Sequence, residues 1–209
     1  MNALLPLLPL ALLACRPDAG APSYPDPEPW VREGDDFYPD PLAEGEERLG
    51  FGVFYEGEAT EALLIDGVDN HFYIYENTFS VATTDDRWEG YVADELENNG
   101  VGWWGGGVHW DIPRDISAWD TLHLALRTDV AVAWDVGLTG GGREVRVPVA
   151  EAGLLADDAW HVLEIPLSRY ADGGADLSSV TVGLLLLGEG GTAGDTVIID
   201  GVYLSRGAE

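Results

Sequence analysis

The sequence predicts an all-β fold, an antiparallel β-sandwich, for most of its 209 residues. Short apolar runs recur along the chain and are separated by Gly, Asp or Asn, which is the spacing of strands joined by turns. Several of these runs alternate apolar and polar residues, as strands with one buried face do. Helical periodicity is weak throughout, so we expect strands and not helices to form the domain.

Charge and composition narrow the class of partner. The chain has 38 acidic and 10 basic residues, the basic ones all arginine, and a formal net charge of −28. The electrostatic field of this net negative charge repels phosphate groups, so nucleic acid and anionic lipid headgroups are poor partners. With 46% hydrophobic residues and eight tryptophans, the chain has enough apolar side chains for a core. Its single cysteine excludes an internal disulfide and a cysteine-based zinc site.

The first fifteen residues indicate the cellular location of the protein. They are apolar, carry no charged side chain and are too short to cross a bilayer core of roughly 30 Å. We interpret residues 1–14 as a secretory signal peptide, although its first residues lack the usual Lys or Arg. Leu12-Leu13-Ala14-Cys15 resembles the bacterial lipobox, whose cysteine is lipidated and becomes the mature N-terminus.

This resemblance implies a lipid anchor on Cys15, which is the protein's contact with a membrane. Arg16 follows the cysteine where Asp would retain a lipoprotein at the inner membrane, so the expected location is the bacterial outer membrane. The alternative is an ordinary cleaved signal peptide that leaves a free cysteine.

Residues 15–50 are expected to be a tether. Seven of the twelve prolines fall there, and the PDPEP pattern is extended and carries like charges that repel one another. Residues 51–209 are expected to form the sandwich domain, because about 159 residues can bury a sizeable core.

The first strand with a functional pattern covers residues 71–75. If Phe72 and Ile74 face the core, Tyr73 and Tyr75 lie on the outer surface of the sheet.

Residues 101–110 repeat this pattern. Val108 shares a face with Trp104 and Trp110, so Trp103 and His109 point outward if Val108 is in the core. The three intervening glycines leave two further readings open: a bulge that reverses this parity, or close approach by a ligand or another backbone.

The later strands follow from the same alternation. Residues 121–127, 130–138, 145–149 and 160–167 each place branched or aromatic side chains on one face, with Trp134 inward. Residues 180–187 are almost entirely apolar, as expected of a central strand, and residues 196–204 form the last strand. Residues 94–98 and 151–155 are expected to be turns.

Four segments in order resemble one family of domains. They are LLIDGVDN (63–70), RDISAWDTLHLALRTD (114–129), DDAWHVLEIPLSRYADGGADLSSV (157–180) and DTVIIDGVYL (195–204). Together they resemble the jelly-roll carbohydrate-binding modules of the galactose-binding-like group. The resemblance implies a jelly-roll sandwich and, for many members, a structural calcium ion between the first and last strands.

At the matching positions stand Asp69, where the family usually has Glu, and Asp200, at the Asp of the closing strand. The resemblance therefore implies Asp69 and Asp200 as ligands of Ca²⁺, which prefers six to eight oxygen atoms. The alternative is that both carboxylates merely cap strand ends.

These observations lead to a functional hypothesis. Flat aromatic rings and planar polar groups are what sugar recognition requires, so Tyr73, Tyr75, Trp103 and His109 are the candidate glycan contacts. We expect a non-catalytic glycan-binding module held on the bacterial cell envelope by a lipid. No GxSxG, HExxH or phosphate-loop motif is present, so no enzyme is expected. The alternatives are a protein-interaction or assembly lipoprotein with the same fold, and a small hydrolase.

Overall fold

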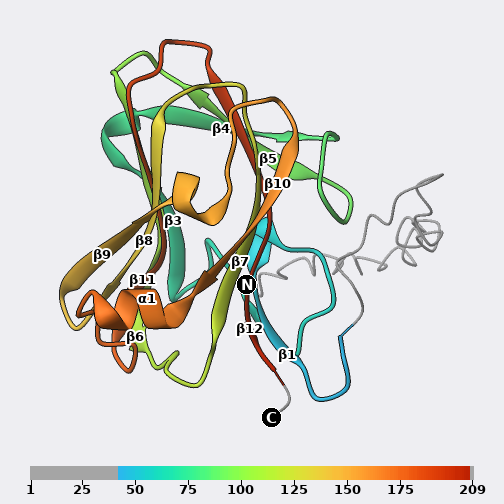
Figure 1. Cartoon of the computed structure of the whole chain (residues 1–209), viewed down its shortest axis with the longest axis vertical. Helices are drawn as coiled ribbons and strands as arrows, with labels where there is room; N and C mark the ends of the chain where they lie inside the picture. Colours follow the sequence, from blue (N-terminus) through green and yellow to red (C-terminus); the bar gives the residue numbers. More distant parts are fainter. Residues whose placement is uncertain (1–41, 208–209) are drawn as a thin grey trace, which may run out of the picture. The chain divides into compact units, whose positions relative to one another are not determined.

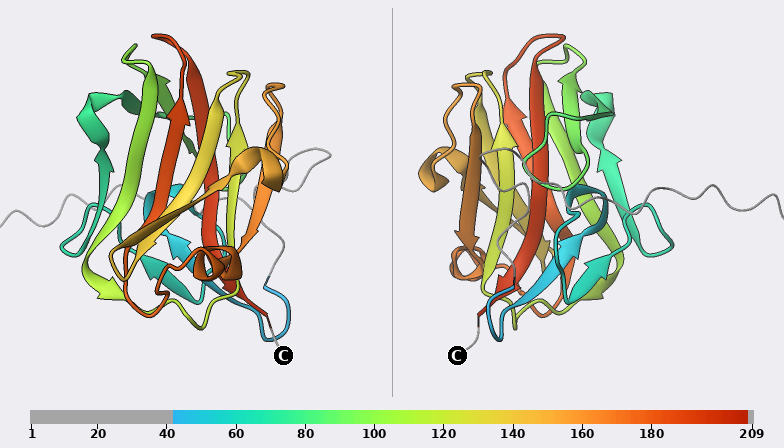
Figure 2. Two further views of the ribbon diagram at one scale, coloured as in Figure 1. Left: turned by 60° about the vertical axis from the view of Figure 1, so that its left-hand side comes forward. Right: turned by 90° about the vertical axis from the view of Figure 1, so that its right-hand side faces the viewer.

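The predicted antiparallel β-sandwich is confirmed. The computed structural model describes residues 42–207, which form two facing sheets and one short helix (Figure 1, Figure 2).

The seven-stranded sheet is organised around its last strand. β12 (Thr196–Arg206) pairs with β7 along one side, and on its other side first with β5 and then with β1. The β1–β2 pair is parallel, and the other pairs in this sheet are antiparallel. The remaining members are β1 (Glu47–Phe51), β2 (Glu61–Leu63), β4 (Phe79–Thr84), β5 (Ala93–Asn98), β7 (Thr121–Arg127) and β10 (Trp160–Pro166).

The five-stranded sheet is centred on β11 (Val180–Glu189), the predicted central strand. Its order is β3-β6-β11-β8-β9, antiparallel throughout. Leu184 and Leu186 face the core, and Leu185 is also buried although it points outward, because side chains cover that face. The other members are β3 (Asn70–Ile74), β6 (Trp103–Arg114), β8 (Ala133–Gly140) and β9 (Arg143–Pro148).

The core fills the space between the sheets with alternating side chains. Leu122, Leu124 and Leu126 of β7 are at most 1% exposed, and Trp134 is in the core as predicted. On β3, Phe72 and Ile74 pack against this core. The alternation on both strands therefore sets which side chains reach the outer surface.

Three sequence expectations were wrong in detail. Residues 94–98 lie in β5 and are not a turn, because Asp94, Leu96 and Asn98 are buried there. β1 begins at Glu47, inside the range assigned to the tether. The helix α1 (Leu167–Asp172) was not expected. Single-turn 3₁₀ helices occupy Gly52–Phe54, Tyr75–Asn77 and Val149–Ala152.

Candidate functional site

The four predicted glycan contacts lie on or beside the outer face of the five-stranded sheet. On β6, Trp104, Val108 and Trp110 are buried in the core, which leaves Trp103 and His109 on the outer face. Tyr73 of β3 lies on the same face, opposite Gly107 of β6. The parity predicted from the sequence therefore matches the structure on both strands.

Three of these side chains form one cluster, which we call the tyrosine–histidine cluster: Tyr73, Tyr75 and His109. The ring centroid of Tyr73 lies 5.0 Å from that of His109, edge-on, and that of Tyr75 lies 5.7 Å away, also edge-on. The Tyr75 hydroxyl and Nε2 of His109 form a 2.6 Å hydrogen bond. Tyr75 belongs to the 3₁₀ turn that follows β3, so this bond fixes the turn against β6.

Trp103 is the first residue of β6, and His109 is the seventh of its twelve residues. The six strand steps between their Cα atoms correspond to roughly 20 Å. Aromatic side chains therefore extend along this half of β6, an arrangement that suits an elongated ligand better than a compact one.

Three buried glycines, Gly105 to Gly107, lie between Trp103 and His109 on β6. A Cβ atom at Gly105 would overlap the Trp103 ring, and one at Gly107 would lie 2.8 Å from the Tyr75 hydroxyl. The pairing of β6 with β11 is regular through these glycines, so they host no bulge. The close approach that the glycines permit is that of Trp103 and Tyr75, which lie down on the sheet.

Polar side chains surround the Trp103 end. A hollow of about 240 Å³ is lined there by Trp103, Asp135 of β8, Arg146 of β9, and Leu187 and Glu189 of β11. Planar charged groups beside an aromatic ring are the usual means of binding hydroxyl groups.

The electrostatics of the cluster keep it uncharged near neutral pH. Burial raises the pKa of Tyr75 to about 12, and the nearby carboxylate of Glu144 on β9 adds to this shift. Burial lowers the pKa of His109 below 6.5. A neutral phenol hydrogen-bonded to a neutral imidazole presents ring surface and polar edges without charge.

Asp69 and Asp200, the predicted calcium ligands, do not form a joint site. Asp69 is exposed just before β3 in the five-stranded sheet, whereas Asp200 is buried in β12 of the other sheet. The Asp200 carboxylate accepts hydrogen bonds from the backbone N–H groups of Trp88, Glu89 and Gly201, at 2.7–2.9 Å. Donors directed at both oxygens oppose a cation there.

Burial nevertheless raises the pKa of Asp200 to about 6. Within residues 42–207, no three His, Cys, Asp or Glu side chains gather as a metal site. The residue pair therefore does not fit the implied ion. Calcium binding stays a prediction, which melting temperatures in calcium and in chelator would test.

Sequence reasoning missed the polar residues of the Trp103 hollow. Asp135 alternates with Trp134 and Val136, and Arg146 lies between Val145 and Val147, so parity alone marks both as outward. The sequence does not reveal that β8 and β9 lie next to β11, which brings these residues into reach of Trp103.

Comparisons with known proteins find likenesses among solved structures. No protein-family model matches the chain, and no curated protein matches it. The structure is similar to a family 11 carbohydrate-binding module of a cellulosomal cellulase from Clostridium thermocellum. That match has 16% identity and a TM-score of 0.47, and covers 68% of this chain and 91% of that one.

Two further solved structures extend the comparison. A family 30 module, also from Clostridium thermocellum, has 16% identity and a TM-score of 0.49, with 78% and 98% of the two chains covered. A module named TmCBM61, solved with β-1,4-galactotriose, has 13% identity and a TM-score of 0.42, with 66% and 88% covered. At these identities the likeness concerns the fold only.

Cys15, the signal peptide and most of the predicted tether lie outside the described residues. In the part of the chain that the structure describes, no helix is long and apolar enough to span a membrane.

Proposed function

We propose that the outer face of the five-stranded sheet binds a neutral glycan chain, and that the domain is a non-catalytic binding module. The observation that carries the proposal is the arrangement of aromatic groups along β6. Trp103 begins the strand and the tyrosine–histidine cluster lies near its middle, and between them Trp103 and Tyr75 lie over Gly105 and Gly107.

The chemistry of this face suits a sugar polymer. Aromatic rings pack against the apolar faces of pyranoses, and Asp135, Arg146 and Glu189 supply hydrogen-bonding groups at the Trp103 end. The net charge of −28 opposes sulfated or uronic acid polymers, which favours neutral glycans.

The test is a glycan-array screen of the full chain, followed by titration calorimetry with the strongest hit. We expect Trp103→Ala and Tyr73→Ala to weaken binding roughly tenfold or more each, because each removes a stacking surface. Tyr91→Ala is the matched control, since Tyr91 is an exposed tyrosine that precedes β5 in the other sheet. Circular dichroism verifies that each variant is folded.

Two results would overturn the proposal. A folded protein that binds no glycan would favour the protein-interaction module, and binding unchanged by both substitutions would place the site elsewhere. The bound glycan is also recovered and sized after incubation, because shortened products would indicate a hydrolase.

We also propose that Cys15 is lipidated and holds the domain at the outer membrane. The supporting observation is the lipobox-like Leu12–Cys15 segment followed by Arg16. Metabolic labelling with a fatty acid analogue tests it: label should enter the wild type, be absent from Cys15→Ser, and fractionate with outer membranes. If the wild-type protein incorporates no fatty acid label, the proposed lipid anchor is refuted.

A further inference from the structure

A second pocket lies on the opposite side of the sandwich. It has a volume of about 170 Å³ and opens on the outer face of the seven-stranded sheet, over β7, β12 and β10. Its lining includes His123, Glu164 and Tyr203 from the strands, and Trp88 and Glu89 from the segment between β4 and β5.

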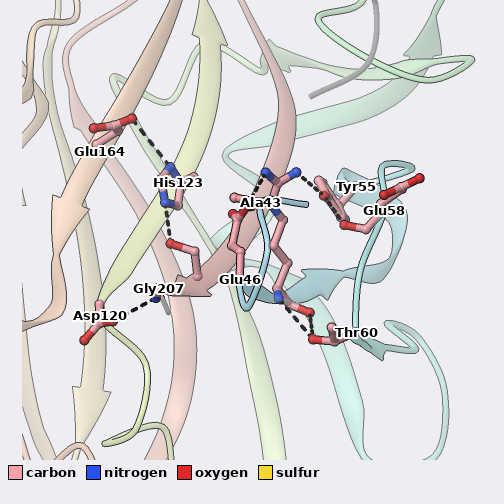
Figure 3. A network of polar contacts seen from close by, with 11 residues as sticks. Ala43, Glu46, Tyr55, Glu58, Thr60, Asp120, His123, Glu164 and Gly207 are labelled. Atoms are coloured by element: carbon pink, nitrogen blue, oxygen red, sulfur yellow. Dashed lines mark hydrogen bonds and ion pairs between the residues drawn. The ribbon is translucent and has the colours of Figure 1, made fainter. Parts of the chain in front are cut away.

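One wall is a rigid aromatic pair. The rings of His123 and Tyr203, which are register partners on β7 and β12, stack with centroids 4.4 Å apart and planes 6° apart. Nε2 of His123 bonds to the Ser205 hydroxyl at 2.8 Å, and Glu164 lies 4.0 Å from its Nδ1 (Figure 3). These contacts hold the imidazole in place before any ligand arrives.

Arg48 packs against Tyr203 in this wall, and its positive charge is neutralised by an ion pair. The side chain is 5% exposed, and its guanidinium lies 5.0 Å from the Tyr203 ring centroid. It donates to both carboxylate oxygens of Glu46, at 2.7 and 3.0 Å, and to the Tyr55 hydroxyl at 3.4 Å. Figure 3 shows Glu46 and Tyr55 within this network of polar contacts. Because Glu46 balances the arginine, the pocket has little attraction for an anion.

Glu89 provides an unmet hydrogen-bonding group. It is fully buried and lines the pocket, and its Oε1 accepts a 2.8 Å hydrogen bond from the backbone N–H of Glu56. Its Oε2 is buried and has no partner of hydrogen-bond geometry among residues 42–207, although the backbone N–H of Gly57 lies near the carboxyl group. A buried carboxyl oxygen without a partner is costly, and a ligand hydroxyl group would satisfy it.

The remaining lining keeps the pocket open and partly apolar. A Cβ atom at Gly201 would lie 3.3 Å from the Trp88 ring, so glycine there leaves room beside the indole. Trp88 is half-buried, and Val162 is 44% exposed at the rim. An indole beside hydrogen-bonding groups is the combination that the proposed glycan face also uses.

We propose that this pocket is a second ligand site, which takes one neutral sugar ring or a polyol of that size. The ring would pack against Trp88 and place a hydroxyl group at Oε2 of Glu89. The volume admits no more than about one ring, so the ligand is a free monosaccharide or the terminal unit of a glycan. This proposal does not depend on glycan binding by the five-stranded sheet.

The experiment is titration calorimetry of the full chain with D-glucose, D-galactose, D-mannose and D-xylose, and with a neutral tetrasaccharide of each responding sugar. We expect a Kd on the order of 1 mM for at least one probe. Val162→Arg, which blocks the rim from an exposed position, should weaken it roughly tenfold or more. Trp88→Ala should do the same, whereas Val81→Arg is the matched control and should bind as the wild type does, because Val81 is an exposed valine of β4 that does not line the pocket.

Every measurement is repeated in a Trp103→Ala background, which removes the other proposed site. Binding of free sugar there supports a monosaccharide pocket, and binding of the tetrasaccharide only supports recognition of a chain end. The proposal is overturned if no neutral sugar binds, if Val162→Arg binds as tightly as Val81→Arg, or if tetramethylammonium competes with the sugar, which would indicate a cation site.

Discussion

Gly105 and Gly183 each lie directly beneath an indole ring, and alanine at these two positions should have opposite consequences. A Cβ atom at Gly105 would overlap Trp103, and one at Gly183 would overlap Trp110. Trp103 is half-exposed on the outer face, whereas Trp110 is 3% exposed in the core. The methyl group added by Gly105→Ala therefore meets a ring that can move into solvent. The one added by Gly183→Ala meets a ring that the core holds in place.

The expected magnitudes follow from this difference. Inserting a methyl group into a packed core costs about 1–3 kcal/mol. Alanine in a strand recovers about 0.5–1 kcal/mol relative to glycine through lower backbone entropy in the unfolded chain. The difference is about 0–2.5 kcal/mol, and because a Cβ at Gly183 would overlap the buried Trp110 ring, the loss of unfolding free energy should fall in the upper part of that range. Gly105→Ala should change it by less than about 1 kcal/mol, because the Trp103 ring swings into solvent.

Urea unfolding followed by far-UV circular dichroism measures both changes, and an unchanged slope verifies that the unfolding transition is comparable. Gly105→Ala should in addition weaken glycan binding, since its indole no longer lies on the sheet. Equal destabilisation by the two substitutions would refute the reasoning, because Trp103 would then be packed like a core residue. A fully stable Gly183→Ala would refute it as well.

Three further predictions concern polar side chains that are buried or partly buried. Thr78→Val should lose about 1–3 kcal/mol in urea unfolding, because the Thr78 hydroxyl bonds both the N–H and the C=O of Gly105. Asp200→Asn should cost a similar amount at pH 7, since an amide nitrogen would replace an oxygen that accepts backbone N–H groups. His109 has a lowered pKa, so the unfolded state binds protons first as the pH falls. Its contribution to stability is complete above pH 6.5 and is lost at lower pH. The stability difference between wild type and His109→Gln should thus shrink from pH 7.5 to pH 5, and a pH-independent difference would contradict this.

The side chains that point outward from β3 and β6 could be predicted from the alternation of apolar and polar residues. The side chains that neighbouring strands place beside them could not. Parity on β3 and β6 follows from Phe72 and Val108, since a strand with one buried face leaves no other choice. Arg146 joins Trp103 only because β9 pairs with β8 and β8 with β11, an order set by distant pairing. β5 was missed because its sequence, ADELEN, is mostly acidic and polar, yet Asp94 and Asn98 are buried between neighbouring strands.

The helix α1 illustrates a different limit of sequence reasoning. Its six residues bury Leu167 and Tyr170, three positions apart, which is too short a pattern to separate from the strand that precedes it. The Tyr170 hydroxyl donates to the carbonyl of Val136 on β8, so a tertiary contact holds the turn in place. The helix propensity of these six residues does not reflect a contact with a distant strand, so the sequence alone does not predict this helix.

The central place of β12 affects how the domain is made. This strand contacts β7, β5 and β1, so the seven-stranded sheet stays divided until residues 196–206 have left the ribosome. Most of its pairings join segments far apart in sequence, which slows folding. The seven-stranded sheet can therefore be completed only after β12 has been synthesised, however early its other strands form.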